Sequence, residues 1–259
     1  MSDQITTAFV QQYKANVINL YQQAGSKLRG LTRMETLVGK QHFFERLGAT
    51  AAVKKLTRHG DTPLVNTPHS RRMVTLVDFE WADLVDQQDK IRLLINPESE
   101  YAINASWALQ RAYDGEVIFA FDGDVKTGET GSTTVTFAND NPAGDLDFSS
   151  AALTTPNLLN VKRKLDEKEV PPGDRFIIVS PPALEQLLKA STAPIAASSD
   201  YNTIKALVNG DLDTWVGFKW VVSTLLPSPA ANKRYCFAWH KNSMGVAMGK
   251  DIQVDIGIR

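Results

Sequence analysis

A chain of 259 residues suffices for one large domain or two modest ones, and its composition, 43% hydrophobic and 22% charged, is ordinary for a soluble globular protein. No apolar run approaches the ~18 residues that a membrane span needs, and the first residues lack the basic-then-apolar order of a signal peptide, so we expect a protein kept in the cytosol or released by lysis. The net charge is −1, but residues 1–60 carry nine Lys or Arg against three acids while the remainder is acidic, which argues against the basic domain typical of specific nucleic-acid binders.

Residues 3–24 are predicted to form a first helix, because apolar side chains recur there at helical spacing while glutamines occupy the opposite face. We expect this helix to be a detached amphipathic arm. Its apolar face would comprise Ile5, Phe9, Tyr13, Val17, Leu20 and Tyr21.

From residue 28 to residue 75 no helical pattern survives, and glycines interrupt the chain repeatedly. Short β-like runs occur at His42–Phe44, Ala51–Val53 and Met73–Val77, and the alternation over 75–82 predicts a half-buried strand. The apolar content of this region is too low for a core of its own. A segment of this length is therefore functional, disordered or packed on another chain.

The longest uninterrupted signal predicts one helix over residues 96–121. Asn96 is a good N-cap, and Pro97 suits the first helical position, where its missing N–H has no cost. At ~1.5 Å per residue the helix would be roughly 35 Å long. Small side chains on its apolar face imply that a sheet lies close against it. This face would comprise Tyr101, Ala105, Ala108, Leu109 and Ala112.

Residues 123–144, rich in Gly, Thr and Asp, predict a surface hairpin with one clear strand at Thr133–Phe137. A compact α/β or α+β domain is predicted over residues 156–240. The only cysteine, Cys236, lies between aromatic residues and is expected to be a buried strand thiol. The strands of this domain are expected at 175–179, an apolar run typical of a strand buried on both faces, and at 218–222 and 235–239, with helices beginning at Thr155, Pro181 and Tyr201.

The search for catalytic chemistry is negative. Gly123 and Gly128 have the spacing of a phosphate loop, but Glu129 stands where the lysine is required. Residues 139–150 resemble a calcium loop whose twelfth position, Ser150, lacks the bidentate acid, so only a loose surface ion site is left open there. The histidines are scattered, and no Gly-x-Ser-x-Gly motif occurs. The sequence thus offers no catalytic, cofactor-binding or metal-ligating residue and does not predict an enzyme.

The arm, the long loop and the long helix, taken together with several sequence stretches, resemble a tailed-bacteriophage major capsid protein. The resemblance implies an α+β fold of the Hong Kong 97 type. Proteins of this family usually continue into a further strand beyond the point where this sequence stops, so we expect a shortened or differently closed version. The stretches are Phe79–Asp86, Asp89–Arg92, Asn96–Pro97, Asp114–Ile118, Asp174–Pro181, Asp211–Phe218 and Gly245–Asp251, and they extend over nearly the whole chain.

The domain organisation that this resemblance implies has five parts. They are an N-terminal arm over 1–29, an extended loop over 30–77, a peripheral domain over 78–155 with its spine helix at 96–121, an axial domain over 156–244, and a return to the peripheral domain over 245–259.

The function that the resemblance implies is that of a major capsid protein, a structural subunit that self-assembles into the icosahedral shell around a double-stranded DNA phage genome. Its partners would be identical subunits in hexamers and pentamers, scaffolding, portal or cement proteins, and packaged DNA in non-specific contact. No cofactor and no membrane are implied, and the protein would reside in the virion after assembly in the host cytoplasm. Two alternatives stay open: the shell protein of a non-viral encapsulating nanocompartment, and a small-molecule enzyme with its site in residues 156–240.

The uneven charge predicts where subunits meet. Lys54, Lys55 and Arg58 belong to the expected extended loop, while Asp83 and Asp86 belong to an acidic segment before the long helix. Because an extended loop in this fold reaches over a neighbouring subunit, we expect its basic tip to dock near the acidic segment of that subunit. The alternative is that both segments are solvated faces.

Overall fold

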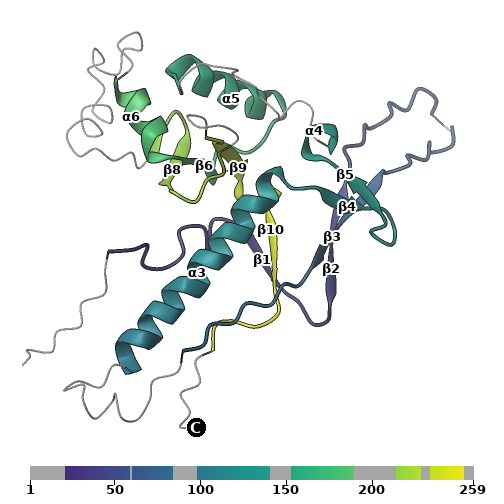
Figure 1. Cartoon of the computed structure of the whole chain (residues 1–259). Helices are drawn as coiled ribbons and strands as arrows, with labels where there is room; N and C mark the ends of the chain where they lie inside the picture. Colours follow the sequence, from purple (N-terminus) through teal and green to yellow (C-terminus); the bar gives the residue numbers. More distant parts are fainter. Residues whose placement is uncertain are drawn as a thin grey trace, which may run out of the picture. The chain divides into compact units, whose positions relative to one another are not determined.

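The computed structural model describes residues 21–58, 60–83, 98–140, 153–189, 214–228 and 234–253. The chain divides into two compact units, and most of their elements are labelled in Figure 1. The first unit comprises Met1–Ser26, Asp78–Asp114 and Lys250–Arg259, and the second comprises Lys27–Val77 and Gly115–Gly249. Residues 3–20 of the helix expected over 3–24, and the helix expected from Tyr201, lie outside the described residues.

The long helix predicted from the sequence is confirmed as α3, which spans Glu98–Asp122 and has 25 residues. Its expected cap, Asn96, lies outside the described residues. The expected apolar face is only partly buried: Ala105 is 7% exposed, but Tyr101 is 38% exposed, and Ala108, Leu109 and Ala112 are half-buried.

Within the first unit, residues 22–26 lie along α3 and contact it through polar groups. Arg111 donates to Oε1 of Gln22 at 2.7 Å, and Nε2 of Gln22 donates to Oδ1 of Asn104 at 2.8 Å. Oγ of Ser26 donates to Oδ1 of the buried Asp114 at 2.5 Å. Residues 22–26 therefore run along α3 in the same direction as the helix, with partners between residues 104 and 114.

The expectation that the first helix continues to residue 24 is wrong. Residues 21–24 contain no helix, and Tyr21, expected on the apolar face of that helix, is fully exposed. The physical reason is that the glutamines, which were expected to face solvent from a helix, are instead engaged by α3: Gln23 also donates to Oδ2 of Asp114 at 2.5 Å.

The second unit contains a four-stranded sheet in the order β7-β8-β6-β9. Strand β6 is parallel to β8 and antiparallel to β9, and β7 is antiparallel to β8. Every residue of β6 is buried, which confirms the prediction of a strand covered on both faces. The strands are β6 at Arg175–Val179, β7 at Thr214–Trp215, β8 at Phe218–Val222 and β9 at Phe237–His240.

One face of this sheet is covered by α5, Thr155–Glu167, and α6, Pro181–Lys189, as Figure 1 shows. The other face meets the last turn of α3, where the ring of Phe121 lies 5.0 Å from that of Phe237 and 4.8 Å from that of Trp239. The sheet therefore lies between α5 and α6 on one face and the last turn of α3 on the other. The side chains buried under α5 and α6 are Leu158, Ile177, Val179, Leu184, Leu187, Phe218 and Trp220.

A second four-stranded sheet, in the order β2-β3-β4-β5, has antiparallel pairing throughout. Its strands are β2 at Gln41–Leu47, β3 at His69–Thr75, β4 at Val125–Thr127 and β5 at Thr133–Val135. The hairpin expected over 123–144 is thus present as β4 and β5. A further pair joins β1, Arg33–Thr36, in parallel to β10, Gly245–Met248, and short helices occur at Phe137–Asp140 (α4) and Lys241–Ser243 (η1).

Several local expectations are wrong. Residues 76–83 and Ala51–Val53 contain no strand, because alternating side chains permit a strand but an edge to pair with is also required. The strand expected at Thr133–Phe137 ends at Val135, because Phe137 already begins α4. Cys236 is exposed and precedes β9, so it is not the buried strand thiol that its aromatic neighbours indicated.

Candidate subunit-contact surface

The β2–β3 hairpin positions the loop that carries the predicted basic tip. Its register runs from Gln41 opposite Thr75 to Leu47 opposite His69, and N of Gly48 donates to O of Pro68 at 2.8 Å, which closes the neck of the loop. The strands also hold each other through side chains, since Arg71 pairs with a Glu45 carboxylate oxygen at 2.9 Å.

The loop beyond this neck, residues 49–67, contains no helix or strand among its described residues. Lys54, Lys55 and Arg58 are all exposed on it. So are large apolar side chains: Leu56 is 87% exposed and Leu64 is 98% exposed. A segment that exposes both charged and apolar side chains of this size has the composition of a contact surface.

The acidic segment is described only up to its middle. Asp83 is exposed and ends the described stretch, while Asp86 lies outside the described residues. Within 76–83, apolar side chains recur at every second position: Val77 is 59% exposed, Phe79 is 47% exposed and Trp81 is 39% exposed. The structure therefore places an acidic and apolar extended segment at the surface, but it does not test whether Lys54 or Lys55 meets Asp83 of another copy.

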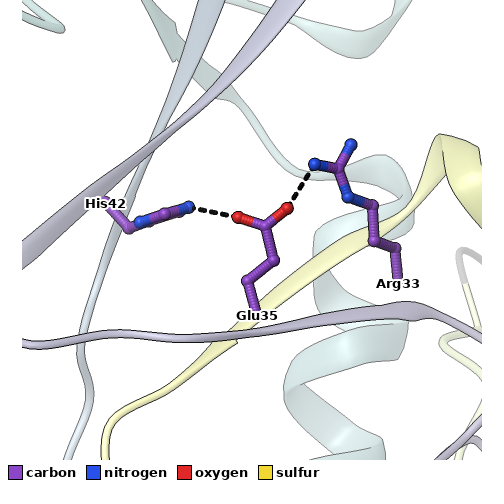
Figure 2. Close-up of polar contacts among 3 residues, drawn as sticks. All are labelled: Arg33, Glu35 and His42. Atoms are coloured by element: carbon purple, nitrogen blue, oxygen red, sulfur yellow. Dashed lines mark hydrogen bonds and ion pairs between the residues drawn. The ribbon is translucent and has the colours of Figure 1, made fainter.

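The base of the hairpin is held by a charged cluster of three side chains (Figure 2). Glu35 of β1 lies between Arg33, on the same strand, and His42 of β2. Nε2 of His42 is 2.7 Å from Oε2 of Glu35, and because a carboxylate only accepts, the imidazole must donate. Arg33 donates to the other carboxylate oxygen. The hydrogen bond from His42 lowers the pKa of Glu35 most. Burial opposes it, and the hydrogen bond and charge of Arg33 lower the pKa further, so the net shift is downward.

A close ring contact reinforces this base. The Phe44 ring meets that of His42 edge-on at a centroid distance of 4.7 Å, and Arg33 lies 5.7 Å above it. A Cβ at Gly245 of β10 would come within 2.8 Å of the Phe44 ring, so only glycine leaves room for it. The hairpin is thus packed onto the β1–β10 pair as well as hydrogen-bonded along its own ladder.

This cluster of Arg33, Glu35 and His42 was not predicted from the sequence. A signal was present: Gly39, with φ of +123°, lies between Glu35 and His42, and a glycine turn brings the residues on its two sides together. The two residues nevertheless belong to strands of different sheets, which sequence spacing does not show.

Among the described residues no group of His, Cys, Asp or Glu is arranged to hold a metal ion. No described helix is long and apolar enough to cross a membrane.

Comparison with known proteins identifies what the chain resembles as a whole. The sequence matches the model of a family described as phage capsid protein over residues 5–259. A search among curated proteins finds no match.

Solved structures with a similar fold come from phages and include phage capsids. The capsid of the cyanophage P-SCSP1u has a TM-score of 0.68 at 16% identity, covering 95% of this chain and 82% of that one. The mature capsid of bacteriophage PhiM1 gives 0.61 at 12% identity, over 93% and 80%, and a structure from Mycobacterium phage Che8 gives 0.62 at 16% identity, over 92% and 83%. These matches confirm the α+β capsid fold.

Proposed function

Since the chain belongs to the phage capsid protein family and is a major capsid subunit of a phage shell, we propose that its copies form hexamers and pentamers that close into an icosahedral shell around double-stranded DNA. The observation that carries the proposal is the family match over residues 5–259, with a capsid fold that covers 95% of the chain in one solved structure. Function then lies in protein interfaces rather than in a reacting site.

Electron microscopy of the purified protein tests this proposal. We expect closed shells or free capsomers, and particles recovered from cells should protect double-stranded DNA from nuclease. A monodisperse small oligomer whose melting temperature rises with a small ligand would overturn it in favour of an enzyme. Shells that enclose protein cargo and no DNA would point to a nanocompartment instead.

The domain assignment is part of the proposal. We assign α3 as the spine helix of a peripheral domain over 78–155, the hairpin region over 30–77 as the extended loop, and residues 156–244 as the axial domain, with the arm over 1–29 and the return over 245–259. The support is local: a 25-residue helix, a hairpin with an exposed loop, and a helix-covered sheet all occur in the expected order along the chain.

The basic tip of the loop docks, in this proposal, on the acidic segment of the next copy. Charge complementarity within one sequence supports it, since exposed Lys54, Lys55 and Arg58 would meet Asp83 and Asp86. Complementary charge mainly speeds correct association and disfavours wrong pairings. The exposed Leu56 and Trp81 give the same contact apolar area.

Further partners follow from a shell of this kind. Scaffolding, portal or cement proteins would contact the same subunits, packaged DNA would touch the inner surface without sequence preference, and assembly would take place in the host cytoplasm before the protein becomes part of the virion. Co-purification of assembly intermediates from infected cells would identify these partners.

A further inference from the structure

Glu35 lies at a corner where two strand systems meet. On one side is the parallel pair of β1 and β10, which N of Leu37 extends by donating to O of Met248 at 2.9 Å. On the other side is the β2–β3 ladder, which N of Leu76 extends by donating to O of Lys40 at 3.2 Å. The chain between β1 and β2 is short, so the corner is where the hairpin is attached.

The charged groups that face Glu35 are few. Its own strand supplies Arg33, β2 supplies His42, and β10, with the sequence Gly-Val-Ala-Met over Gly245–Met248, supplies none. One carboxylate thus accepts from two basic groups, one on each side of the corner (Figure 2). Its side chain keeps 28% of its exposure, so protons from solvent reach it.

We propose that Glu35 is an acid-sensitive latch that fastens the β2–β3 hairpin to the β1–β10 pair. With Glu35 ionised, His42 and Arg33 both donate to it and the base of the hairpin is fixed. When the carboxyl group is protonated, its attraction to both basic groups is lost. The hairpin is then held less firmly at its base, and its ladder opens more often from that end.

The direction of the pH dependence follows from the lowered pKa of Glu35. A carboxyl group whose pKa is lower in the folded protein stabilises the fold above its unfolded pKa, near 4.5, and loses that contribution as the pH falls through the lower folded value. The latch therefore holds at neutral pH and opens in acid. The proposal concerns the isolated subunit and does not depend on how shells are built.

Hydrogen exchange of the free subunit, followed from about pH 7 to about pH 3 and corrected for the intrinsic rate, tests the latch. In the parent, amides of β2 and β3 should lose protection in a step below pH 4.5. Glu35→Gln should exchange there roughly two- to fivefold faster at neutral pH, the size expected for an exposed ion pair, and should show no acid step. Amides of β6 should be unaffected in both.

The matched control is Glu45→Gln, which removes a carboxylate from the same hairpin, where it pairs with Arg71 at 2.9 Å. This variant should keep the acid step. A second variant, His42→Phe, retains a ring against Phe44 and removes the donor, so it should reduce the step. The proposal is overturned if Glu35→Gln keeps the acid step or exchanges like the parent at neutral pH, or if Glu45→Gln abolishes the step.

Discussion

The two four-stranded sheets of the second unit are held together by different forces. In the β7-β8-β6-β9 sheet all residues of β6 are buried, and Ile178 and Val179 are completely inaccessible. In the β2-β3-β4-β5 sheet no residue of any strand is buried. The second sheet relies on its backbone ladder and on polar contacts such as Glu45 with Arg71.

This contrast separates what a subunit can stabilise alone from what it offers to others. Burial of apolar area contributes about 25 cal/mol per Å², and the β6 core obtains this contribution within one chain. The hairpin leaves Leu56 and Leu64 exposed, so the same contribution is available to it only from a neighbouring molecule. The core makes the subunit stable, whereas the loop of the hairpin keeps exposed apolar area that a contact with another molecule could bury.

Limited proteolysis should show the contrast at its largest. Trypsin should cut the free subunit after Lys54, Lys55 or Arg58 at least about a thousandfold faster than after Lys219, because cleavage within the β8 ladder requires the core to open first. Mass spectrometry of the first fragments measures this. First cuts at Lys219, whose side chain is itself 55% exposed, would show that the core is not the more stable region.

The next largest difference is expected in the free energy of unfolding when one leucine of the core and one leucine of the hairpin loop are each replaced by alanine. Leu187→Ala removes a fully buried side chain of α6 and should lower the free energy of unfolding by roughly 2–5 kcal/mol. Leu64→Ala, at a site 98% exposed, should leave it unchanged within ~0.5 kcal/mol. Denaturant titration measures the free energy of unfolding of both variants. Equal losses would mean that the loop is buried in the free subunit.

Removal of one arginine from each sheet should give a smaller difference between the two losses in the free energy of unfolding. Arg175 is 3% exposed and donates to Oδ1 of Asp166 at 2.6 Å and to O of Pro171 at 2.9 Å, which ties the end of α5 to β6. Arg175→Ala leaves acceptors without their donor and should lower the free energy of unfolding by roughly 1–3 kcal/mol. Arg71→Ala breaks an exposed pair and should lower it by ~0–1 kcal/mol. A larger loss of unfolding free energy from Arg71→Ala than from Arg175→Ala would contradict the contrast between the two sheets.

The smallest effect per contact is expected at the proposed docking site. Lys54→Glu with Lys55→Glu should slow assembly, and adding Asp83→Lys with Asp86→Lys should partly restore it, since exposed pairs contribute only ~0–1 kcal/mol each. Light scattering over a series of salt concentrations follows the rate. If the double swap restores nothing and the rate does not depend on salt, the basic tip does not dock there.

The sequence predicted elements whose signals are local. The apolar run 175–179 became β6, the pattern over 96–121 became α3 at Glu98–Asp122, and the hairpin expected over 123–144 is present as β4 and β5. In each, the residues that set the structure lie within a few positions of each other. Their burial or capping is therefore visible in a short window.

Features that depend on distant pairing were not predictable. Residues 75–82 alternate as a strand does, yet the ladder ends at Thr75, because the pattern does not tell whether a partner edge is present. The contact between Glu35 and His42 also needs a corner between sheets that no local pattern specifies. The basic and acidic segments were recognised by composition, but their contact would involve two copies and is not tested by one chain.

The pairing of β1 with β10 also bears on the order of events during translation. Arg33 pairs with Gly245 and Thr36 with Met248, so the pair needs strands that the ribosome makes far apart in time. At ~5–20 residues per second, β1 waits on the order of ten to forty seconds for its partner. Until then Gly245 is not in place behind Phe44, and the corner that carries the hairpin is incomplete. The base of the hairpin is therefore completed only after β10 has left the ribosome.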